Sequence, residues 1–280
     1  MEAIHKEGDP AKLIAYLRDE RAKPRAELLA LNREIAAVAY LAGDFDNARK
    51  AIQAVLAHDP DDLDALNSIG HIYRLRGPLG DAERAYKRVL ELSEENSSGR
   101  AAANGNIGVL YLLQGDLDKT EEYCLKALDL NYALDRKDGM ANQYGDLGIV
   151  YKIRGDLDKA EEYYLKSLEF NKALGRKEGM ASVYGHLGNL YLKRGDLDKA
   201  EEYHLKSLNL NEASGSKEGM VSAYSDLGDV YLARGDHGKA IEYWDRAGHL
   251  YSGIDASPNI EMLWDLLDEL REDDEDDDEG

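Results

Sequence analysis

Residues 155–168 read GDLDKAEEYYLKSL. Forty residues later, residues 195–208 read GDLDKAEEYHLKSL, and forty residues earlier, residues 115–128 read GDLDKTEEYCLKAL. A fixed period of roughly 20–50 residues is the signature of a stacked-repeat protein, in which each unit buries its apolar face only against its neighbours. The period therefore predicts the architecture, and it favours an interaction surface over an active site.

One repeat, residues 141–180, predicts two antiparallel helices, which we call helix A and helix B. The apolar stripe of helix A is formed by Tyr144, Leu147, Gly148 and Tyr151. The stripe of helix B is formed by Leu157, Ala160, Tyr164 and Leu168. Between them Gly155 breaks the helix and Asp156 can N-cap the next one. Gly175 then ends helix B, and residues 177–180 are expected to lead into the next repeat.

The same residue types occur at fixed positions along the chain. Position 8 is glycine at Gly70, Gly108, Gly148, Gly188 and Gly228, and position 11 is tyrosine at Tyr73, Tyr111, Tyr151, Tyr191 and Tyr231. Together with glycine at position 15 and alanine at position 20, this pattern resembles the tetratricopeptide repeat. Six repeats begin near residues 29, 63, 101, 141, 181 and 221, and the last three spacings are 40 residues. The longer repeat is similar to those of kinesin light chains and spindle-orientation adaptors.

The resemblance implies an all-α fold, a right-handed superhelical solenoid of antiparallel helix pairs with N- and C-terminal capping helices. The array is expected over residues 29–252, after an N-terminal capping region at residues 1–28. Residues 258–271 form a further amphipathic helix in this prediction, with an apolar stripe at Ile260, Leu263, Trp264, Leu267 and Leu270. Residues 272–279 are all acidic, so we expect residues 272–280 to form a disordered tail.

A second face of helix A carries the candidate binding residues. Positions 2, 5, 6, 9, 12 and 13 lie together, away from the packed face, and in tetratricopeptide proteins they line a concave groove that binds peptides. The candidate groove residues are Asn67, His71, Arg74, Asn106, Val109, Asn142, Asp146, Ile149, Lys152, His186, Asn189 and Lys193. Two units of this chain differ mainly there: residues 141–154 and 181–194 differ at seven positions, five of which are groove positions. Drift at exposed positions is the alternative explanation of that difference.

Composition argues against several other classes of protein. The formal net charge is −21, which opposes non-specific nucleic-acid binding. A single cysteine, Cys124, cannot form an intrachain disulfide, and no apolar segment is long enough to span a membrane, so we expect a cytoplasmic protein. The sequence contains none of the phosphate-binding, zinc-binding or nucleophile motifs that we sought, and we expect no enzymatic activity, cofactor or metal. Cys124 and His204 both stand at position 24, where a core-filling role is expected.

The predicted function is that of an adaptor or scaffold, which captures a peptide segment of a protein partner in the groove of repeats 2–5. Two alternatives remain open at this point. The array could be structural and self-associate end to end through its terminal repeats. Alternatively, the helix at residues 258–271 and the acidic tail could occlude the groove and regulate it.

Overall fold

The computed structural model describes residues 25–251, and in this part of the chain all regular structure is α-helical. The helices pack as six consecutive antiparallel pairs, which confirms the predicted all-α fold of stacked helical hairpins. Most of the predicted N-terminal capping region lies outside the described residues. The predicted helix at residues 258–271 and the acidic tail at residues 272–280 also lie outside them.

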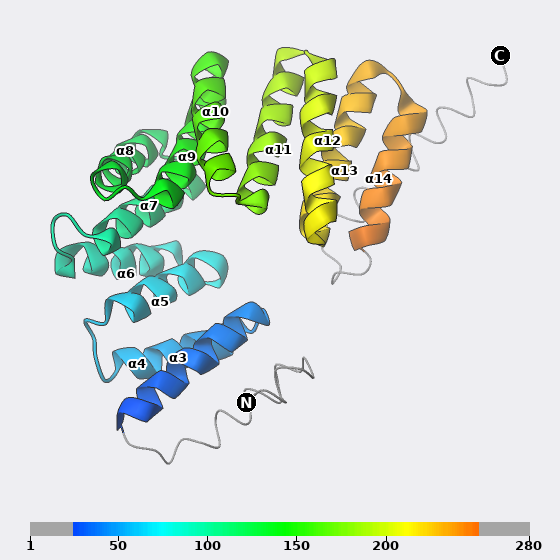
Figure 1. Cartoon of the computed structure of the whole chain (residues 1–280). Coiled ribbons are helices and arrows are strands. Elements are labelled where there is room, and N and C mark those ends of the chain that lie inside the picture. The colour runs from blue at the N-terminus through cyan, green and yellow to red at the C-terminus, as the bar shows by residue number, and fades with distance from the viewer. Residues whose placement is uncertain (1–24, 252–280) are drawn as a thin grey trace, which may run out of the picture. The chain divides into compact units, whose positions relative to one another are not determined.

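The chain divides into two compact units between Arg136 and Lys137. The first contains α3 (Arg25–Leu41), α4 (Phe45–Leu56), α5 (Leu63–Arg76), α6 (Leu79–Leu92), α7 (Ser98–Leu113) and α8 (Leu117–Ala133). The second contains α9 (Lys137–Arg154), α10 (Leu157–Ala173), α11 (Lys177–Arg194), α12 (Leu197–Ser214), α13 (Lys217–Arg234) and α14 (His237–Tyr251). Within each unit every helix packs against the next helix along the chain (Figure 1). The odd-numbered helices are the A helices, and the even-numbered helices are the B helices.

Local sequence sets the turn between the two helices of a pair. In repeat 4, Gly155 has a φ of 86°, a left-handed conformation that a side chain would strain. The next residue, Asp156, accepts a hydrogen bond from the backbone N–H of Lys159 at 3.2 Å and so caps α10, as predicted. Gly175, with a φ of 66°, follows the other end of α10 in the expected position.

One local expectation was wrong. Residues 177–180 are not a connector, because α11 begins at Lys177 and these residues form its first turn. Helices α11 and α12 each have 18 residues, whereas α5 and α6 of the shorter repeat 2 each have 14. Each helix of repeat 5 is thus about one turn longer than its counterpart in repeat 2, and the connection after helix B is shorter, at residues 215–216 against residues 93–97.

Position 24 fills the core of each hairpin, as predicted. Its occupants are at most 4% exposed, and they are Ile52, Tyr86, Cys124, Tyr164, His204 and Trp244. In repeats 2 to 6 the side chain lies directly on the glycine at position 8: a Cβ placed on Gly188 would be 2.5 Å from the imidazole of His204. The absence of a side chain at position 8 is thus what admits a large residue at position 24.

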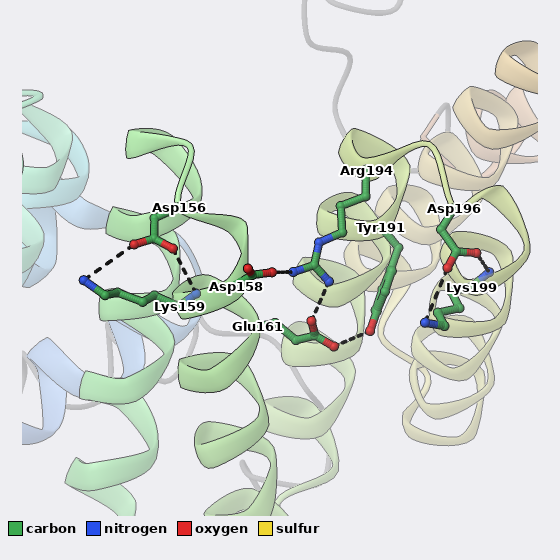
Figure 2. A network of polar contacts seen from close by, with 8 residues as sticks. All are labelled: Asp156, Asp158, Lys159, Glu161, Tyr191, Arg194, Asp196 and Lys199. Atoms are coloured by element: carbon green, nitrogen blue, oxygen red, sulfur yellow. Dashed lines mark hydrogen bonds and ion pairs between the residues drawn. The ribbon is translucent and has the colours of Figure 1, made fainter.

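A polar network joins neighbouring repeats on the side of the stack shown in Figure 2. Arg194, at the end of α11, donates from Nη1 to Glu161 Oε2 and from Nη2 to Asp158 Oδ1 of α10, each at 2.5 Å. The hydroxyl of Tyr191 donates to the other oxygen of Glu161. Burial alone would raise the pKa of Glu161, but these hydrogen bonds hold that pKa below its usual value.

The same network recurs between repeats 5 and 6, where Arg234 and Tyr231 bind Glu201 and Arg234 also binds Asp198. In the first unit Tyr111 donates to Glu83 at 2.9 Å, but the residue in the place of Arg194 is Gln114. The recurring segment of the sequence thus serves to hold one hairpin on the next.

Candidate functional site

The predicted groove positions of the A helices remain accessible in the second unit. Helix α11 packs between α9 and α13, so three A-helix faces adjoin one another. Of the predicted groove residues, Asn142 and Lys193 are exposed, and Asp146, Ile149, Lys152, His186 and Asn189 are half-buried. We call these residues, together with those at positions 2, 5, 6, 9, 12 and 13 of the repeat on α13, the A-helix face of the second unit.

Several of these residues interact with each other or with the scaffold. Lys193 Nζ donates to the carbonyl oxygen of Lys152 at 3.3 Å, and Arg176 Nη1 donates to Asn142 Oδ1 at 3.2 Å. The imidazole of His186 stacks on the ring of Tyr164, with centroids 5.3 Å apart. Burial, together with the nearby charge of Lys152, lowers the pKa of His186 to about 4. His186 is therefore neutral at pH 7.

The first unit has a separate A-helix face. There Asn106 Nδ2 of α7 donates to Asn67 Oδ1 of α5 at 2.9 Å, so these two amides partly satisfy each other. His71 lies edge-on to Tyr86, and burial lowers its pKa. His71 and Arg74 also line a cleft of about 570 Å³ between α3 and α5, whose wall is largely apolar and includes Tyr40. Val109 lies half-buried on α7.

A second cleft, of about 510 Å³, lies between α11 and α13 and is floored by α12. His186 and Asn189 are on its α11 side. Its α13 side carries Ser222 and Asp226. Three carboxylates, those of Glu178, Glu218 and Asp226, line the cleft, and no lysine or arginine is among its lining residues. Asp226 lies on the predicted face of repeat 6 but is absent from the candidate set above.

His204 lies behind Asp226 in the core. Its ring is fully buried, Nδ1 is 3.5 Å from Asp226 Oδ2, and neither ring nitrogen has a hydrogen-bond partner. Burial lowers the pKa of His204 to about 4. Burial and the neighbouring charge of Asp229 raise the pKa of Asp226 to about 6, against a hydrogen bond from Asn189 and the charge of Lys152. At neutral pH an ionised Asp226 therefore faces a neutral imidazole.

Comparison with known families identifies the repeats. The family model described as a MalT-like TPR region matches residues 72–262, and a tetratricopeptide repeat model matches residues 33–97. The chain belongs to the tetratricopeptide repeat family. A comparison with curated protein sequences found no match.

Solved structures share the tetratricopeptide fold at low sequence identity. BtubC from P. vanneervenii is 23% identical with a TM-score of 0.59, and the match covers 77% of this chain and 91% of BtubC. A chain of the APC/C hetero-tetramer Cut9-Hcn1 is 19% identical with a TM-score of 0.71, and the match covers 96% of this chain and 47% of that chain. A putative kinesin light chain from Podosopora anserina is 16% identical with a TM-score of 0.54 over 71% and 99%. At these identities the likeness concerns the fold alone.

Within residues 25–251 this tetratricopeptide array offers no group of His, Cys, Asp and Glu side chains that could hold a metal ion. No helix in the same range is long and apolar enough to cross a membrane. Cys124, the residue that could have suggested a nucleophile, is buried against Gly108, with its Sγ 3.0 Å from where a Cβ would lie.

Proposed function

We propose that this tetratricopeptide array is a non-catalytic adaptor that binds a peptide segment of a protein partner on its A-helix faces. The candidate contacts are the predicted groove residues of repeats 2–5, taken separately in the two units. The acidic net charge favours a protein partner over nucleic acid. The single buried cysteine favours a reducing, cytoplasmic compartment.

The observation that carries the proposal is where the copies differ. Between repeats 4 and 5 helix A changes at seven residues, of which 142, 146, 149, 152 and 153 are exposed or half-buried on the A-helix face and 143 and 150 are buried. Within the second unit the polar network between repeats is instead repeated without change: Tyr191, Arg194 and Glu161 have identical counterparts in Tyr231, Arg234 and Glu201. The chain thus preserves its scaffold and varies the face that a ligand could reach.

The test is affinity purification of the full chain with mass spectrometry, in the wild type and in Lys193→Glu. Lys193 is exposed and makes one hydrogen bond from its ammonium group, so its charge can be reversed with little effect on packing. The control is Lys159→Glu, on helix B, where an acid in the first turn suits the helix dipole. We expect Lys193→Glu to lose captured proteins that Lys159→Glu retains. Identical capture by all three proteins, each with unchanged thermal unfolding, would contradict the proposal.

The same preparations test the structural alternative. Light scattering on the full chain, with and without residues 258–280, measures end-to-end association. An adaptor is expected to have one mass that does not rise with concentration, whereas a self-assembling array would grow.

A further inference from the structure

The cleft between α11 and α13 has an unbalanced charge. Glu178 and Glu218 stand in the first turns of α11 and α13, where the helix dipole partly compensates them. Asp226 lies in the middle of α13 and has no such compensation. Its side chain is 20% exposed, so part of the carboxylate reaches the cleft while the rest is covered by protein. This combination leaves a poorly solvated negative charge at the cleft wall.

The residue behind Asp226 also lacks polar partners, although it lies in the core and does not itself line the cleft. His204 is fully buried, its Nδ1 faces the carboxylate at 3.5 Å, and both ring nitrogens lack hydrogen-bond partners. In repeat 4 the same position holds Tyr164, and the residue of the next repeat that corresponds to Asp226 is His186, which stacks on Tyr164 with ring centroids 5.3 Å apart. An unpaired buried polar atom typically costs about 1–3 kcal/mol. Tyr164 carries one such atom, its hydroxyl oxygen, whereas His204 carries two.

We propose that this cleft binds the cationic side chain, lysine or arginine, of the partner's peptide, with Asp226 as the principal counter-charge. The inference rests on the proposed peptide-binding function and names the chemistry of one contact. A cleft of about 510 Å³ can admit a whole side chain together with part of its backbone. Asn189, Ser182 and Ser222 line the same cleft and can accept hydrogen bonds from the ammonium or guanidinium group.

The charges around Asp226 are consistent with an added cation. The charge of Lys152 on α9 lowers the pKa of Asp226, but its influence is smaller than that of burial or of Asp229. Asp229 is itself poorly solvated, and this burial raises its pKa. The other titratable groups nearby are Glu178, Glu218, His186 and His204. Both histidines are neutral at pH 7, so neither replaces a ligand cation.

Binding should consequently weaken in mild acid. Because the pKa of Asp226 is raised to about 6, the carboxylate takes up a proton as the pH falls through that value, and its attraction for a cation is lost. A bound cation would favour the ionised form and lower the same pKa. Affinity is therefore expected to be highest above pH 7 and to fall by at least threefold at pH 5.5.

The experiment is an NMR titration of the isotope-labelled full chain with blocked tripeptides, acetyl-Gly-X-Gly-amide. X is arginine, lysine or citrulline; citrulline has nearly the shape of arginine without its charge. We expect the arginine and lysine probes to shift the amide signals of Ser222, Asp226 and Asn189, and the citrulline probe to bind at least tenfold more weakly, about 1.4 kcal/mol. Equal binding of arginine and citrulline would overturn the inference.

Two variants at the same repeat position provide the matched control. Asp226→Asn should weaken the arginine probe at least tenfold, whereas Asp146→Asn, at position 6 of repeat 4, should change it less than twofold. Since the folded-state pKa of Asp226 is raised, removing its charge should stabilise the fold at pH 7, so that lost binding cannot be ascribed to unfolding. Unchanged binding in Asp226→Asn, or an equal loss in Asp146→Asn, would refute the site. The tripeptides report on this cleft alone, whereas the Lys193→Glu purification reports on partner capture, so the two proposals can fail separately.

Discussion

Replacing His204 with phenylalanine should make the second unit both more stable and less sensitive to acid. The imidazole is fully buried on Gly188 and both of its nitrogens lack partners. Tyr86 and Tyr164 occupy the same position in repeats 2 and 4 and are also fully buried, so the hairpin accommodates an aromatic ring of this size. Phenylalanine removes two unsatisfied polar atoms and leaves no new ones. The expected gain at pH 7.5 is about 1–3 kcal/mol.

The pH dependence follows from the pKa of His204, which falls from an ordinary 6.5 to about 4 on folding. A lowered pKa stabilises the fold above pH 6.5, and this stability is lost as the pH falls toward 4. Between pH 7.5 and 5.5 the linkage relation gives a loss of about 1.4 kcal/mol from this residue. As the pH falls, the lowered pKa of His186 also destabilises the fold, whereas the raised pKa of Asp226 stabilises it. The contribution of His204 is therefore read from the difference in pH dependence between the wild type and His204→Phe.

The assay is urea unfolding at pH 7.5 and 5.5, followed by the fluorescence of Trp244, which is buried in the adjoining repeat. Trp264→Phe is introduced into every protein, so that one tryptophan reports. The wild type should lose about 1.4 kcal/mol more than His204→Phe over this interval. His58→Gln, at an exposed histidine of the first unit, serves as the control and should behave as the wild type. If the unfolding free energies of the wild type and of His204→Phe change equally with pH, to within about 0.5 kcal/mol, the burial argument for His204 is wrong.

Two further predictions concern the scaffold. In double-mutant cycles measured by urea unfolding, Arg194 should couple more strongly to Glu161, which is 26% exposed, than to Asp158, which is 98% exposed. We expect a coupling energy of about 1 kcal/mol for Glu161 and less than about 0.3 kcal/mol for Asp158, because exposed ion pairs are screened by solvent. Equal coupling energies would contradict the geometry. Gly188→Ala should destabilise the fold by about 1–3 kcal/mol, since the added Cβ would lie 2.5 Å from the imidazole of His204. Gly108→Ala should destabilise it less in a thermal unfolding assay, because its Cβ would lie 3.0 Å from the sulfur atom of Cys124. The reverse order of the two effects would refute the packing argument.

The helical hairpins and their contacts could be predicted because they are encoded locally and repeated. Gly155, Asp156 and Gly175 determine where helix A ends and where helix B begins and ends, and each acts within a few residues of its own position. The large residue at position 24 and the glycine at position 8 also recur, so their pairing follows from the period. The one local error concerns residues 177–180, which were expected to lead into the next repeat; they already belong to α11, and Gly179 lies in its first turn against the buried amide of Asn171.

The candidate site was accessible to sequence reasoning only in part. The A-helix faces followed from helical periodicity, and Lys152, His186, Asn189 and Lys193 do share one face of the second unit. Whether a side chain on that face meets solvent, a neighbour or a core residue depends on the adjacent repeat, which the pattern of one helix does not contain. His186 was expected as a ligand contact, yet its ring also rests on Tyr164.

By itself, the sequence determined the repeat, the helix pairs and the residues that hold them in register, because backbone hydrogen bonds, caps and apolar stripes depend on near neighbours along the chain. Only the tertiary structure decided the charge state of the cleft. His204 comes from α12 and Asp226 from α13, and their opposite pKa shifts arise from burial between packed helices. Desolvation is a property of the assembled environment, so it brought out a pair of residues to which the sequence had assigned no joint role.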